Sequence, residues 1–159
     1  MSEQNQAEQN PRNFALQRIY VKDLSFETPN SPAVFTEAWK PESNLNLNSS
    51  VTKLTDHTYE VVLTVTVTTK VGDKTAYLVE VQQAGVFIVQ GFPEAELGPM
   101  LGVYCPNVLF PYARETVSDL VTRGSFPQLL LTPVNFDALY VQHLQEQRKK
   151  SAENANKAH

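Results

Sequence analysis

The side chains of this sequence best suited to chemistry gather in CPNVLFPYARE, residues 105–115, which holds the one cysteine of the chain. Cys105 precedes a proline near an expected helix start, and a helix N-terminus can lower the pKa of a thiol. A thiolate nucleophile also needs a base, and no motif ties Cys105 to any of the three histidines. We therefore favour an inert, buried thiol, with a small α+β enzyme that uses Cys105 as the alternative.

Charged residues offer weaker candidates. Arg114 and Glu115 are adjacent, so on a helix they point about 100° apart and do not pair with each other. Asp23, Glu27 and Glu80 have no accompanying set of catalytic or metal-ligating partners, which favours solvated surface acids. Phosphate-binding loops and the G-x-S-x-G and H-E-x-x-H motifs are absent. One cysteine allows no internal disulfide and makes a zinc cluster implausible.

Composition limits the class of protein. With 159 residues, of which 42% are hydrophobic, one domain with a real core is expected. The apolar runs are short and broken by proline or glycine, and the N-terminus is no secretory signal, so a cytoplasmic protein without a membrane span is expected. The ends are polar, which predicts a flexible arm at 1–13, a single domain at 14–148 and a flexible tail at 149–159.

The charge is unevenly spread along the chain. The net charge is −4, and residues 148–159 carry +3 of their own, which leaves −7 for the rest. An acidic body argues against nucleic acid as the main partner. It is compatible with a basic protein partner, and equally with simple solubility.

Period-two alternation predicts four strands, at 14–27, 43–54, 58–70 and 75–89. Tight turns at 56–57 and 71–74 join the last three into an antiparallel meander, and a long connection follows the first strand. In the first strand, alternation places Tyr20 with Phe14 and Phe26, and Asp23 with Glu27 on the opposite face. The fourth strand has apolar residues on both faces. This indicates either a subunit interface or ordinary core packing with a misassigned register.

The period changes after residue 91. A short helix is expected at 93–102, an amphipathic helix within 108–124 and a second one at 136–150, with Asn135 as its N-cap. Gly124 stands where a C-terminal glycine cap belongs. Strands first and helices second predict an α+β fold with the helices on one face of the sheet.

Six stretches then resemble one family, in order and with its spacing, from about Gln17 to Tyr140. They are QRIYVKDLSFETPNSP, YEVVLTVTVT, EVQQAG, YCPNVLFPYARE, RGSFPQL and PVNFDALY. They resemble SecB, the family of bacterial protein-export chaperones. The resemblance implies a four-stranded antiparallel sheet with a crossover connection, two helices behind it, and a homotetramer built as a dimer of dimers.

The resemblance also implies a function without catalysis, ATP, cofactor or metal. Members of the family hold unfolded precursor proteins in the cytosol and hand them to the SecA motor for export. A SecB-like chaperone of a toxin–antitoxin system and a pocket protein for one apolar ligand are further alternatives. The family's motor carries a basic segment, which would complement the acidic body.

Three sets of site residues follow from the resemblance. The SecA-binding positions are Asp23, Glu27, Leu78 and Glu80. The client-binding candidates are Phe35, Trp39, Leu45, Phe136 and Leu139. The subunit-interface candidates are Val79, Val81, Gln83, Ala113, Val117 and Leu120.

Overall fold

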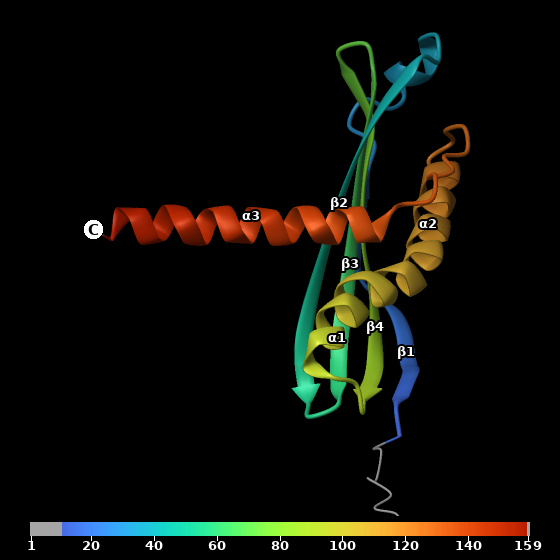
Figure 1. Cartoon of the computed structure of the whole chain (residues 1–159). Coiled ribbons are helices and arrows are strands. Elements are labelled where there is room, and N and C mark those ends of the chain that lie inside the picture. The colour runs from blue at the N-terminus through green and yellow to red at the C-terminus, as the bar shows by residue number, and fades with distance from the viewer. Residues whose placement is uncertain (1–10, 159) are drawn as a thin grey trace, which may run out of the picture.

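The chain folds as a four-stranded antiparallel sheet that carries its main helix on one face (Figure 1). The computed structural model describes residues 11–158, so most of the arm expected at 1–13 and His159 lie outside the described residues. The strands are β1 (Asn13–Glu27), β2 (Pro41–Thr55), β3 (Thr58–Val71) and β4 (Lys74–Gln90), in the spatial order β1-β4-β3-β2. The helical segments are η1 (Ala33–Thr36), α1 (Glu94–Pro99), η2 (Met100–Tyr104), α2 (Cys105–Arg123) and α3 (Phe136–Lys157). The predicted α+β class, meander and crossover are confirmed.

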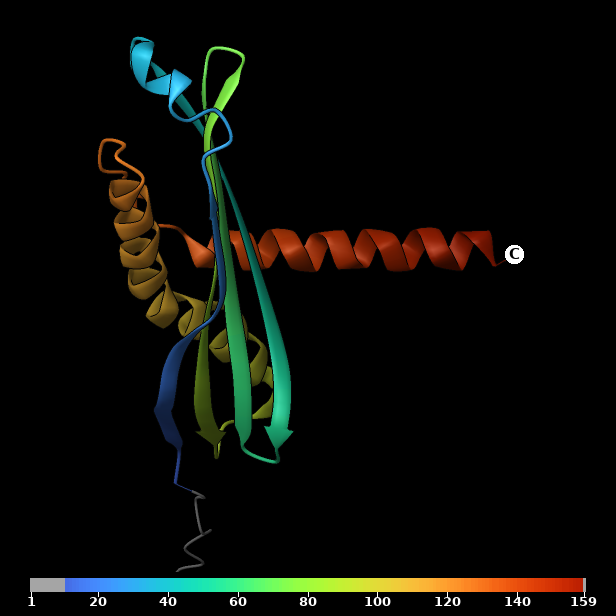
Figure 2. The same ribbon diagram turned by 180° about the vertical axis from the view of Figure 1, so that it is seen from behind.

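The two central strands build the core. In β3 and β4 every second side chain is buried on the face that α2 covers, which we call the inner face. Tyr59, Val61, Leu63, Val65 and Val67 of β3 lie there. Their β-branched and aromatic side chains suit a pleated, buried surface. The opposite, outer face of these strands is only partly buried, and Figure 2 shows it from behind without a covering helix along the centre of the sheet.

The edge strand β1 departs from simple alternation. Its register against β4 shifts at Gln17 and again at Lys22, so the strand contains two bulges. The predicted face of Tyr20 is wrong, because each extra residue in a bulge inverts the side to which the following residues point. Tyr20 lies on the outer face and reaches Glu60 there, whereas Phe14 packs on the inner face against Phe87, with 5.7 Å between ring centroids.

The segment after the sheet is almost continuously helical. The helix predicted at 93–102 is present as α1 and η2, and η2 leads without a break into α2, which begins at Cys105 rather than at 108. The helix ends at Gly124 as expected, but the left-handed residue is Ser125, with φ 68°. Gly124 itself is required by close packing, because a Cβ atom there would lie 2.6 Å from the ring of Phe26.

The last helix is longer than the sequence pattern indicated. Asn135 caps it as predicted, since its side chain accepts a hydrogen bond from the Ala138 amide. Residues 149–157, which we assigned to a flexible tail, instead continue α3 to Lys157. Glu146 precedes Lys150, and Glu153 precedes Lys157, by four residues, which is the favourable order for a helical charge pair. Among the residues that the structure describes, neither of these ion pairs forms, so the spacing alone does not explain the longer helix.

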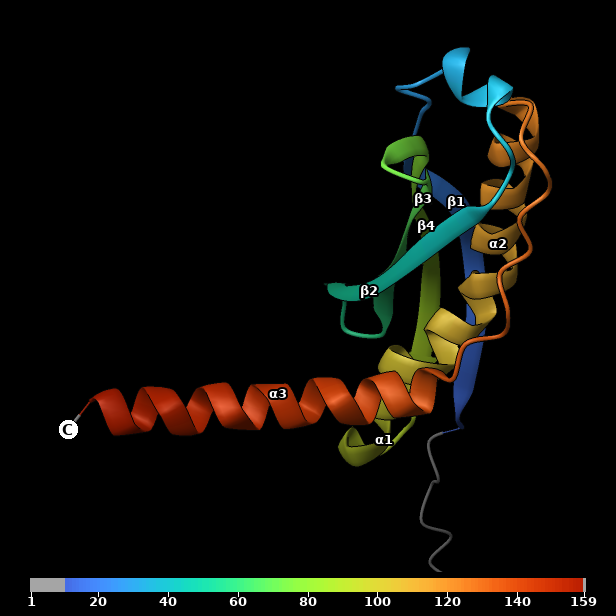
Figure 3. The same cartoon turned by 90° about the horizontal axis from the view of Figure 1, so that it is seen from above.

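Helix α3 stands out from the body of the molecule. Its first residue, Phe136, is buried and packs against Phe110 of α2, with ring centroids 5.9 Å apart. Tyr140 lies against Gly98 and Gly102, where an added Cβ atom would meet its ring or hydroxyl at 2.5–2.7 Å. Beyond these contacts the helix passes the β2 edge and projects away from the sheet (Figures 1 and 3).

Candidate functional site

Acidic residues from two strands meet on the outer face. In the register of β1 against β4, Asp23 pairs with Gln82 and Glu27 pairs with Leu78. Glu80 stands two residues from Leu78 on the same strand and therefore on the same face. The four SecA-binding candidates thus form one contiguous surface, which we call the acidic patch. The shared face of Asp23 and Glu27 was predicted correctly, because no bulge lies between them.

The acidic patch is held by few polar contacts. Glu80 accepts a long hydrogen bond from the Thr66 hydroxyl on β3, at 3.4 Å. Four ion pairs join other residues, and none of them, within residues 11–158, involves Asp23, Glu27 or Glu80. Asp23 and Glu27 are exposed and Glu80 is half-buried. Their carboxylates would attract a basic partner, and salt would screen that attraction.

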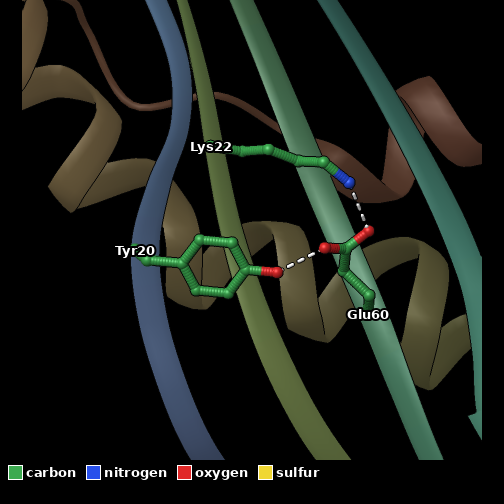
Figure 4. Close-up of polar contacts among 3 residues, drawn as sticks. All are labelled: Tyr20, Lys22 and Glu60. Carbon is green, nitrogen blue, oxygen red and sulfur yellow. Dashed lines mark hydrogen bonds and ion pairs between the residues drawn. The ribbon is translucent and has the colours of Figure 1, made fainter.

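A polar cluster that the sequence did not indicate lies farther along the same face (Figure 4). The Glu60 carboxylate on β3 accepts hydrogen bonds from the Tyr20 hydroxyl and, at 2.8 Å, from the Lys22 ammonium group. Both donors belong to β1, so the contacts reach across β4. The hydrogen bond to Glu60 raises the pKa of Tyr20 to about 12. The hydrogen bonds from Lys22 and Tyr20 hold the pKa of Glu60 below its ordinary value.

The lowered pKa of Glu60 makes a prediction about pH. A carboxyl whose pKa is depressed by folding adds stability above its unfolded pKa, and that contribution is lost as the pH falls through its folded-state pKa. We expect wild type to be more stable than Glu60→Gln near neutral pH, and the difference to shrink on acidification. Urea unfolding of both proteins from about pH 7 to pH 3, at one protein concentration, measures this. A difference that stays constant with pH would contradict it.

The client-binding candidates divide between two places. Phe35 and Trp39, from the connection between β1 and β2, each stack against Phe126, with ring centroids 5.3 Å and 5.7 Å apart. Phe126 also contacts Tyr77 of β4, at 5.0 Å. Phe126, which the sequence analysis did not single out, is thus the centre of an aromatic cluster. Phe35 and Trp39 keep 49% and 36% of their surface exposed, so this aromatic cluster offers an apolar outer rim.

Phe136 and Leu139 lie elsewhere, at a cavity of about 610 Å³ between β2, η2 and α3. Apolar and small residues predominate in its lining, among them Leu47, Val51 and Leu101. Leu45 lines neither the cavity nor the aromatic cluster, and is an exposed residue of the β2 edge. The structure therefore brings the candidates together in two pairs, with Leu45 standing apart.

The subunit-interface candidates lie inside the single chain. Val79, Val81 and Gln83 point from β4 toward α2, and Ala113 and Val117 of α2 are buried against them. Only Leu120 is partly exposed. Any effect of the buried residues on association would therefore be transmitted through the position of α2.

Cys105 is buried at the start of α2. Burial raises the pKa of its thiol to about 12, opposite to the lowering that a helix start can cause. The thiol is therefore protonated at neutral pH, which is unfavourable for a nucleophile.

The described part of the chain holds neither a cluster of metal ligands nor a helix suited to a membrane. No group of three or more histidine, cysteine, aspartate or glutamate side chains in residues 11–158 could hold a metal ion. None of the helices in this range is long and apolar enough to cross a membrane.

Comparisons of the whole sequence with known proteins point to one family. A family model described as "Preprotein translocase subunit SecB" matches residues 6–147. The protein-export protein SecB of Methylococcus capsulatus is 62% identical over 145 residues, which cover 91% of this chain and 92% of the relative. That of Nitrosococcus oceani is 58% identical over 160 residues, covering 99% and 94%.

A solved structure shares the fold at a greater distance in sequence. It is the SecB-like chaperone Rv1957 of Mycobacterium tuberculosis in complex with a ChAD peptide from the HigA1 antitoxin, at 20% identity and a TM-score of 0.65. The match covers 76% of this chain and 90% of the other.

Proposed function

This chain belongs to the SecB family, and from that premise we propose that it binds unfolded precursor proteins in the cytosol and delivers them to the SecA motor. Its role is that of a protein-export chaperone, the function named for relatives at 54–62% identity. The observation that carries the proposal is the pairing of exposed apolar surfaces with a separate acidic patch on the outer face.

Client binding rests on the aromatic cluster and the α3 cavity. An unfolded precursor exposes apolar and aromatic segments, and burying them contributes about 25 cal/mol per Å² of apolar surface. The rims of Phe35 and Trp39 and the side chain of Leu139 are exposed and available for this contact. Because such binding requires no sequence motif, it suits many precursors, and no ATP and no catalytic residue are needed.

Delivery rests on the acidic patch. We infer that a basic segment of SecA docks on Asp23, Glu27, Leu78 and Glu80, with charge attraction setting the rate of encounter and Leu78 supplying apolar contact. Four copies in a dimer of dimers would add avidity for a long client. The antitoxin alternative is disfavoured because the relatives at 54–62% identity are named as export proteins.

The test of the proposed function is capture of an unfolded precursor. A urea-unfolded precursor is diluted into this protein, and the complex is followed by light scattering and size exclusion beside the same precursor already folded. We expect capture of the unfolded form alone, by a species near four times the 17.8 kDa chain mass. Equal binding of the folded precursor, or no capture of either form, would contradict the chaperone reading.

Replacing Trp39 tests the aromatic cluster as client surface. We expect Trp39→Ala to weaken capture of the unfolded precursor about fivefold, because it removes an exposed apolar surface worth about 1 kcal/mol. The oligomer should keep its mass in size exclusion, since Trp39 lies on the connection between β1 and β2 and is not among the subunit-interface candidates of β4 and α2. Exposed Leu130, in the connection between α2 and α3, gives a matched control: Leu130→Ala should capture as wild type does. Unchanged capture by Trp39→Ala would remove the cluster from the client site.

A further inference from the structure

The bulge at Lys22 decides which face Asp23 occupies. Val21 pairs with Gln83 and Asp23 pairs with Gln82, so Lys22 is the extra residue of β1 at this point. Side chains alternate along a strand with a period of two, and therefore Asp23 would share the inner face of Val21 if the bulge were absent. The bulge moves Asp23 to the outer face, where it joins the acidic patch.

Little else on β1 holds this bulge in place. The strand is at the edge of the sheet, and a bulge leaves its extra residue outside the ladder of backbone hydrogen bonds. Inner-face packing is weak here, because Val21 and Leu24 remain 42% and 45% exposed. The Gln83 amide donates a hydrogen bond to the Tyr20 carbonyl at 3.1 Å, which fixes the backbone on the N-terminal side of the bulge only.

The Glu60 carboxylate on β3 binds β1 at two points, one just before the bulge and one at the bulge itself. Glu60 binds the hydroxyl of Tyr20, which precedes the bulge, and the ammonium group of Lys22, the bulged residue itself. The Glu60 side chain is 14% exposed, whereas that of Lys22 is 47% exposed. Glu60 is therefore well packed, while the β1 residue that it binds is open to solvent. Because β4 lies between β1 and β3, the hydrogen bonds of Glu60 also hold β1 at a set distance from β3 on the outer face.

We propose that Glu60, through Tyr20 and Lys22, is a positioning residue for SecA docking, because it holds the β1 bulge that presents Asp23 to the partner. This inference rests on the proposed docking of SecA on the acidic patch. It adds residues that would not touch SecA and whose role is to set the geometry of one that does.

Because Lys22 is charged, the electrostatic and the positioning explanations predict opposite changes in SecA affinity when it is replaced. Lys22→Met removes a positive charge beside the acidic patch, so electrostatics alone would tighten binding of a basic partner. Loss of the bulge geometry would weaken it instead. Tyr20→Phe changes no charge and removes the other hydrogen bond to Glu60. Lys22→Arg keeps a charged donor for Glu60 and serves as the conservative rescue.

The measurement is the dissociation constant for purified SecA of Methylococcus capsulatus at low ionic strength, by titration calorimetry, with capture of the unfolded precursor measured beside it. We expect Lys22→Met and Tyr20→Phe each to weaken SecA binding about fivefold, with client capture unchanged and Lys22→Arg close to wild type. Lys53→Met is the charge-matched control, since Lys53 lies on the opposite edge strand, and should bind SecA at least as tightly as wild type.

The outcomes separate the two proposals. Suppose that the single variant Asp23→Asn weakens SecA binding, while Lys22→Met binds SecA as tightly as wild type or more tightly. That result would overturn the positioning role and leave the docking surface in place. Equal loss of SecA binding and client capture would also overturn it, because that pattern indicates general destabilisation. A wild type that does not bind SecA would overturn the docking proposal itself, and the positioning role with it.

Discussion

The substitution Glu80→Lys is expected to abolish most SecA binding while the protein still captures unfolded precursors. Glu80 is central in the acidic patch, between Leu78 and Gln82 on β4 and opposite Ser25 of β1. Reversing its charge places a cation against a basic partner, and the penalty for such a contact is several kcal/mol, so we expect about 30-fold or greater loss of affinity. The folded state loses only the long hydrogen bond from Thr66.

Two measurements make this result interpretable. Titration of SecA at rising salt should show a shallower salt dependence for Glu80→Lys than for wild type, because fewer charges attract. Asp56→Lys, in the exposed turn between β2 and β3, makes the same change in net charge away from the patch and should bind nearly as wild type does. If both variants lose SecA equally, overall charge rather than the patch decides binding. Equal loss of client capture would contradict the separation of the two surfaces.

The substitution Phe126→Ala is expected to have the largest effect on stability. Phe126 is 6% exposed and contacts Phe35, Trp39 and Tyr77, so its removal leaves a cavity at the centre of the aromatic cluster. Replacing a buried phenylalanine by alanine costs about 3–5 kcal/mol. We also expect weaker client capture, because the rim formed by Phe35 and Trp39 loses its support.

Trp39 reports on this change directly, because it is the only tryptophan in the chain. Its emission should shift toward that of a solvated indole in Phe126→Ala, under conditions where the protein is still folded. Phe35→Ala is the matched control, since Phe35 is 49% exposed and its loss should cost far less stability. Urea unfolding at one protein concentration compares the three proteins. A midpoint for Phe126→Ala equal to that of wild type would show that the aromatic cluster does not depend on Phe126.

The sequence could predict the regular parts of the fold because their signals are local. Alternation over 58–70 locates a half-buried strand whatever surrounds it, and the turn residues at 71–74 force the next strand to pair with it. Asn135 caps the last helix through its own side chain and an amide three residues later, again a local contact. The shared face of Asp23 and Glu27 follows from even spacing within one strand, so the sequence could also predict the β1 part of the acidic patch.

Other features depend on partners that are far away in the sequence. The bulges of β1 arise from pairing with β4, and no residue within 14–27 marks where the extra residues fall, so the face of Tyr20 was predicted wrongly. The Glu60 cluster joins residues about 40 positions apart. Phe126 gives no signal of its own in a loop, and acquires its role only because the β1–β2 connection folds over it.

The amino-acid sequence by itself therefore determined the elements, their order, the α+β class and the family. Hydrophobic period, turns, caps and family motifs are all local patterns along the chain. Only the tertiary structure decided which faces are covered and which side chains meet. The outer face is open because α2 covers the inner one, Val79 and Val81 are buried because α2 lies on them, and the client candidates divide because α3 leaves the body at the β2 edge. These are contacts between elements, and their geometry is set by packing over the whole domain.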